Sequence, residues 1–124
     1  MKQTALPKTV LIVEDNELSM RLFHALIESQ GHNALQARGA TEALALVREY
    51  HPNLIIMDIQ LPEVSGLVAA KWIKEDEHLK DIPIIAVTAM VGQAKASREA
   101  GCEAYVLKPI SVASFLNTVE KLLG

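Results

Sequence analysis

Three short apolar runs, each followed directly by charged residues, constrain the fold of this chain more than any other feature. The runs and the charges after them are residues 10–13 with Glu14 and Asp15, residues 54–57 with Asp58, and residues 105–107 with Lys108. Apolar runs this short are typical of strands that are buried on both faces, as in parallel sheets. Because the carboxyl ends of such strands gather the ligands of open α/β sheets, we expect three carboxylates and one ammonium group to converge on one site.

The rest of the chain alternates between strand and helix patterns. Two further strands are expected at residues 34–37 and 84–87, the latter introduced by Pro83. Apolar residues at helical spacing predict helices around residues 22–27, 41–50, 68–73 and 91–100, and a last one after Ser111 as its N-cap. Five β-α units predict an α/β doubly wound, five-stranded parallel sheet with helices on both faces. We expect the flavodoxin-like strand order 2-1-3-4-5.

Length and composition limit the organisation and the surroundings of the chain. Its 124 residues, half of them hydrophobic, suffice for one domain, which we place at residues 9–124 after an N-terminal tail at residues 1–8. A net charge of -3 argues against a nucleic-acid-binding surface. The single cysteine, Cys102, excludes an intrachain disulfide, and neither a signal peptide nor a membrane-spanning run is present. We therefore expect a cytoplasmic protein without membrane insertion.

The charges at the strand ends suggest phosphoryl chemistry. Strands one and three flank the point where the strand order reverses, which places Glu14 and Asp15 beside Asp58. Like charges ~4 Å apart repel by roughly 4 kcal/mol at an effective dielectric constant near 20, so the cluster should have raised pKa values or bind a cation. Mg²⁺ suits such a site, and an Asp58 oxygen could attack phosphorus. Lys108 and the Thr88 hydroxyl would hold the oxygens of the transferred group.

The motifs at these strand ends also occur together in a known family. They are Glu14-Asp15, Met57-Asp58 with Pro62 and Gly66, Thr88-Ala89, and Lys108-Pro109. In this order they resemble the receiver domain of two-component response regulators over essentially the whole chain. The resemblance implies that Asp58 accepts a phosphoryl group from a histidine kinase or a histidine phosphotransfer protein. It also implies a Mg²⁺ site in which Asp15, Asp58 and the Gln60 carbonyl bind directly and Glu14 binds through water.

The same resemblance implies a signalling switch rather than an enzyme. Thr88 would move toward the phosphoryl group, Tyr105 would turn inward behind it, and the Lys108-Pro109 peptide would be cis. A downstream protein target would then bind the face formed by the fourth helix and the fifth strand. Gln60 and Met90 would flank the water that removes the phosphoryl group. The role implied is that of a stand-alone regulator in cell-cycle or polarity control, although the stretch from Thr88 to Lys108 is slightly shorter than the family pattern.

Several alternatives remain open at this level. Taken singly, Asp58 could cap a helix and Lys108 could be a solvated surface residue. A haloacid-dehalogenase-type phosphatase also uses a strand-end aspartate, but Gln60 stands where its second aspartate is required. A flavodoxin needs a phosphate-binding loop where this chain has the acidic residues 14–17. A receiver-like module that binds partners without phosphorylation stays possible, whereas a DNA-binding regulator is not expected because no helix-turn-helix follows Gly124.

Overall fold

The computed structural model describes residues 6–124 as five β-α units. Its strands are β1 (Thr9–Val13), β2 (Asn33–Ala37), β3 (Leu54–Asp58), β4 (Ile84–Thr88) and β5 (Ala104–Leu107). They form one sheet in the order β2-β1-β3-β4-β5, and every neighbouring pair is parallel. The predicted fold class and strand order are therefore confirmed. Residues 1–5 of the predicted tail lie outside the described residues, so the boundary at residue 9 stays a prediction.

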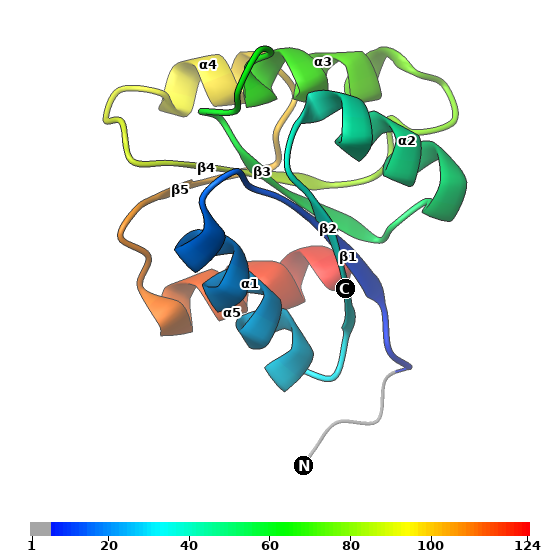
Figure 1. Ribbon diagram of the computed structural model, residues 1–124. Helices are drawn as coiled ribbons and strands as arrows, with labels where there is room; N and C mark the ends of the chain where they lie inside the picture. Colours follow the sequence, from blue (N-terminus) through cyan, green and yellow to red (C-terminus); the bar gives the residue numbers. More distant parts are fainter. Residues whose placement is uncertain (1–5) are drawn as a thin grey trace.

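Five helices cover the two faces of the sheet (Figure 1). They are α1 (Glu17–Ser29), α2 (Ala40–Tyr50), α3 (Gly66–Glu75), α4 (Ala94–Glu99) and α5 (Val112–Leu123). Helices α1 and α5 pack together on one face, where the rings of Phe23 and Phe115 lie 5.3 Å apart between centroids. Helices α2, α3 and α4 cover the opposite face, and the buried side chains of the strands separate into two corresponding layers. Among residues 6–124, no helix combines the length and apolar composition that a membrane span requires.

The helix ends follow local chemistry, with two differences from the sequence-based expectations. Helix α4 begins at Ala94 rather than near residue 91, because Gly92 has a positive φ of 85° that interrupts a right-handed helix. Ser111 occupies the N-cap position of α5 as expected, but its side chain makes no capping hydrogen bond. By contrast, the Asn16 side chain accepts a hydrogen bond from the Ser19 backbone N–H and caps α1.

The strand register brings the chemically active residues to one edge of the sheet. Val13 pairs with Met57, so Glu14 follows its strand at the same level as Asp58. On the other side of β3, Asp58 pairs with Val87, one residue before Thr88. Thr88 in turn pairs with Leu107, and the next residue is Lys108. Four loops therefore begin at the carboxyl ends of β1, β3, β4 and β5, which is where a doubly wound sheet binds its ligands.

Candidate functional site

Two buried carboxylates and one ammonium group form the centre of this edge. Glu14 and Asp58 are only 1% and 6% exposed, although both are acidic. The Lys108 Nζ donates a hydrogen bond to Glu14 Oε1 at 2.9 Å and lies 3.7 Å from Asp58 Oδ2. The structure thus brings together three of the residues that the sequence places in the site. They come from three separate strands, β1, β3 and β5.

The two carboxylates share a single cation, the Lys108 ammonium group, and the pKa of Asp58 is raised. That pKa is raised from 3.8 to about 6, mainly by burial of the carboxylate and next by its interaction with the Glu14 carboxyl group. The Gln60 backbone N–H, which donates to Asp58 Oδ1 at 3.0 Å, and the Lys108 charge act in the opposite direction. An additional cation at the carboxylates would favour the ionised form of Asp58.

The remaining predicted metal ligands lie further out. Asp15 follows Glu14 but is exposed, and Gln60 is exposed as well. Within residues 6–124 no three His, Cys, Asp or Glu side chains are grouped as a ready-made metal site. The donor set nevertheless fits Mg²⁺, which commonly uses one or two carboxylates and completes its shell with water and phosphate oxygens. The excess of carboxylates over ammonium groups at Asp58 is the observation that supports this fit.

A chain of hydrogen bonds joins the loops after β3, β4 and β5. The fully buried Thr88 donates its hydroxyl hydrogen to Gln60 Oε1 at 3.2 Å and accepts a hydrogen bond from the Met90 backbone N–H at 3.1 Å. The Tyr105 hydroxyl donates to the Met90 carbonyl at 3.1 Å, and the Tyr105 side chain is half-buried. Sequence reasoning named all four residues separately, but it did not find the bonds that connect them.

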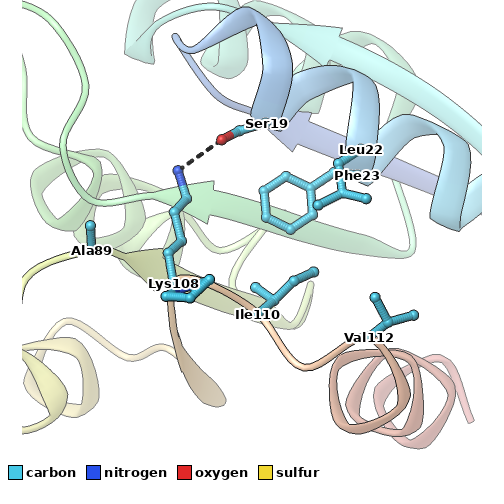
Figure 2. A pocket seen from close by; sticks show the side chains of 8 residues that line it. Ser19, Leu22, Phe23, Ala89, Lys108, Ile110 and Val112 are labelled. Atoms are coloured by element: carbon cyan, nitrogen blue, oxygen red, sulfur yellow. Dashed lines mark hydrogen bonds between the residues drawn. The ribbon is translucent and has the colours of Figure 1, made fainter.

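The Lys108 side chain also borders a cavity of about 400 Å³ between the start of α1 and the loop after β5 (Figure 2). Besides the ammonium group, the walls are mainly apolar, with Leu22, Phe23 and Val112 among them. The Lys108 Nζ points toward Ser19 and donates to its Oγ at 3.4 Å. Sequence reasoning missed Ser19, although its place in the first turn of α1, just after Glu14 and Asp15, could have indicated a position beside the site.

Two backbone features fix the positions of Asp58 and Lys108. Gly66 is the first residue of α3, and its backbone N–H donates to the Ile59 carbonyl at 2.8 Å. A Cβ atom at this glycine would lie 2.0 Å from the Asp58 backbone oxygen, so no larger residue fits without a shift of the chain. The Lys108-Pro109 peptide is cis, as expected, and the Lys108 backbone N–H donates to the Thr88 carbonyl at 2.8 Å.

Comparisons with known proteins agree with this geometry. Residues 10–120 match the response regulator receiver domain family. The polar-differentiation response regulator DivK of Brucella ovis is 57% identical over 119 residues, which cover 94% of this chain and 97% of that protein. The receiver domain of a sensor histidine kinase from Pseudomonas aeruginosa PAO1, solved with magnesium in its active site cleft, has a TM-score of 0.87 at 27% identity and covers 95% of this chain and 98% of that one.

A third neighbour is the phosphorylated cyanobacterial phytochrome response regulator RcpA. It has a TM-score of 0.79 at 26% identity, with 94% of this chain and 91% of that chain covered. The chain described here belongs to the response regulator receiver family. It is similar to DivK in particular.

Membership of the family defines the class of activity. Receiver domains are signalling switches rather than enzymes, and they work with a kinase or phosphotransfer protein on one side and with downstream targets on the other. They generally bind Mg²⁺ in the active site. These statements confirm the expectations of the family, of a switch, and of two-component signalling. The roles of individual residues in this chain are taken up as proposals below.

Proposed function

We propose that this chain is a phosphoacceptor switch in which Asp58 takes a phosphoryl group from a phosphohistidine of a histidine kinase or phosphotransfer protein. The observation that carries the proposal is the buried Asp58 carboxylate, with the Lys108 Nζ 3.7 Å away and Glu14 beside it. A buried acidic pair with one shared ammonium group is a costly arrangement for the fold, and such arrangements are concentrated at functional sites. The similarity to DivK extends the proposal to control of cell cycle and polarity.

The transfer step uses Asp58 as the nucleophile and Lys108 and Thr88 as donors to the phosphoryl oxygens. An Asp58 oxygen attacks phosphorus, an O–P bond forms, and the P–N bond to the donor imidazole breaks so that its electron pair returns to the nitrogen. Asp58 must be ionised for this attack, and a pKa of about 6 leaves most of the carboxyl groups ionised at neutral pH. Lys108 then exchanges its bond to Glu14 for one to a phosphoryl oxygen, and Thr88 binds a second oxygen.

Mg²⁺ is the cofactor that this donor set suits. Asp15, Asp58 and the Gln60 backbone carbonyl would hold it directly, and Glu14 would do so through water. Bound there, the ion supplies positive charge that offsets the repulsion between the carboxylates and an incoming phosphoryl group. Burial of Asp58, its raised pKa and the magnesium reported for the Pseudomonas receiver domain support this assignment.

The surface beside Lys108 is suited to receive the phosphoryl donor. Leu18, Leu22 and Val112 are 75%, 43% and 44% exposed, and the last two border the 400 Å³ cavity next to Lys108. Apolar side chains that are exposed together next to a reactive site indicate a protein-binding surface. A donor that covers α1 and the loop after β5 would bring its phosphohistidine to the Asp58 side of Lys108.

Phosphorylation in vitro tests the proposal. Incubation with Mg²⁺ and acetyl phosphate, or with a phosphorylated histidine kinase, is expected to give an adduct that survives acid and is cleaved by hydroxylamine. The same treatment of Asp58→Asn is expected to give no adduct, while Asp81→Asn, which changes an exposed aspartate in the loop before β4, is a matched control that keeps it. Absence of the adduct in the natural chain, or its persistence in Asp58→Asn, would refute the proposal.

A further inference from the structure

The side chain of Gln60 contacts the residue that is proposed to move on phosphorylation. Thr88 has one hydroxyl hydrogen, and in this structure the Thr88 Oγ1 donates it to Gln60 Oε1 at 3.2 Å. The same oxygen accepts the Met90 backbone N–H at 3.1 Å, so the hydroxyl is satisfied as donor and as acceptor. Thr88 can therefore not donate to a phosphoryl oxygen unless it releases Gln60.

The backbone of Gln60 is tied to the phosphoacceptor itself. Its N–H donates to Asp58 Oδ1 at 3.0 Å. One residue thus contacts the site of modification through its main chain and Thr88 through its side chain. A change in the charge or the position of the Asp58 carboxylate acts directly on the segment that carries the Gln60 amide.

The hydrogen bonds continue from Thr88 through the Met90 backbone to Tyr105 in β5. The Tyr105 hydroxyl donates to the Met90 carbonyl at 3.1 Å, while the Met90 N–H is held by Thr88. Met90 itself is exposed, so these two backbone bonds fix the start of the loop between β4 and α4. When Thr88 turns away, the Met90 N–H loses its acceptor and the loop that holds the Tyr105 hydroxyl is released.

We infer that Gln60 is a positioning residue that holds Thr88 in its unphosphorylated orientation and thereby sets how readily the switch responds. The inference rests on the proposed function, because it concerns the response to a phosphoryl group on Asp58. The hydrogen bond between Gln60 and Thr88 exists only in the unphosphorylated orientation of Thr88. It therefore lowers the apparent affinity for a phosphoryl group or a phosphoryl mimic, which stabilises the other orientation. A hydrogen bond of ordinary strength changes such an equilibrium by about three- to tenfold.

The test is a double-mutant cycle read out by binding of beryllofluoride, a mimic of the phosphoryl group, in the presence of Mg²⁺. Gln60→Met keeps the length of the side chain and removes the acceptor oxygen. It is expected to raise the affinity for beryllofluoride by about three- to tenfold, because no bond to Thr88 has to break. In a Thr88→Val background the same change is expected to alter the affinity by less than about twofold, whereas in Thr88→Ser, which keeps the hydroxyl, the gain should persist.

A second readout separates positioning from a general effect on the fold. The Met90 amide resonance of free Gln60→Met is expected to move part of the way toward its position in the natural chain bound to beryllofluoride, because the switched state becomes more populated. An equal gain in the Thr88→Val background, an unchanged or weaker affinity of Gln60→Met, or an unmoved Met90 resonance would overturn the inference and leave the proposed function intact. If the natural chain does not bind beryllofluoride at all, the proposed function fails, and the role of Gln60 fails with it.

Discussion

Replacement of the Asp58 carboxylate by an amide is expected to make the fold more stable at neutral pH. Asparagine keeps the shape of the side chain and an oxygen that accepts the Gln60 backbone N–H, but it carries no charge beside Glu14. Burial and Glu14 raise the pKa of Asp58 from 3.8 to about 6 in the folded protein. At pH 7 this difference corresponds to a loss of about 3 kcal/mol in the free energy of unfolding, so we expect Asp58→Asn to regain about 2–3 kcal/mol.

The pH dependence gives this prediction its sign. Because the folded pKa lies above the unfolded value, the folded state holds the proton more tightly between pH 3.8 and about 6, and the natural chain loses stability as the pH rises through that range. Urea unfolding in EDTA should therefore show a large difference between the natural chain and Asp58→Asn at pH 7 and a small one at pH 4. The control Asp81→Asn should change the free energy of unfolding by less than about 0.5 kcal/mol at both pH values. A difference that is the same at both pH values, or a less stable Asp58→Asn at pH 7, would refute the reasoning.

Three further changes test other parts of the site. Gly66→Ala places a Cβ atom 2.0 Å from the Asp58 backbone oxygen and should lower the free energy of unfolding by at least about 2 kcal/mol in urea titrations. Lys108→Met should slow labelling by acetyl phosphate at least about a hundredfold, because it removes the cation that lies 3.7 Å from Asp58. Leu22→Asp should reduce the rate of transfer from a phosphorylated kinase far more than the rate of labelling by acetyl phosphate, and equal losses would contradict a docking role.

Much of the fold could be predicted because the relevant signals are local. Each run that predicts a strand is short and either ends at a charged residue or follows a proline, and strand pairing then follows from the few topologies that β-α repeats allow. The position of Glu14, Asp58 and Lys108 at one edge follows from the same topology. Glu14 directly follows β1, Asp58 is the last residue of β3 and Lys108 directly follows β5, so their proximity needs only the correct strand order.

Features that depend on side-chain orientation could not be predicted in this way. The sequence places both Glu14 and Asp15 beside Asp58, yet Glu14 turns into the sheet edge and is 1% exposed while Asp15 remains at the surface. The Thr88–Gln60 hydrogen bond depends on the rotamer of the Gln60 side chain, and no sequence pattern predicts that rotamer. The sequence predicts a start of α4 near residue 91 instead of at Ala94, because a glycine with positive φ cannot be distinguished from a helical one by composition.

The most direct measurement concerns where the phosphoryl group resides. Treatment of the phosphorylated chain with borohydride reduces an aspartyl phosphate to homoserine, and peptide mass spectrometry then locates the altered residue. The buried pair of Glu14 and Asp58 with Lys108 predicts homoserine at position 58 alone, formed only when Mg²⁺ and a phosphoryl donor are both present. Homoserine at position 15, a phosphorylated side chain elsewhere, or no altered residue would contradict the assignment of Asp58 as the phosphoacceptor.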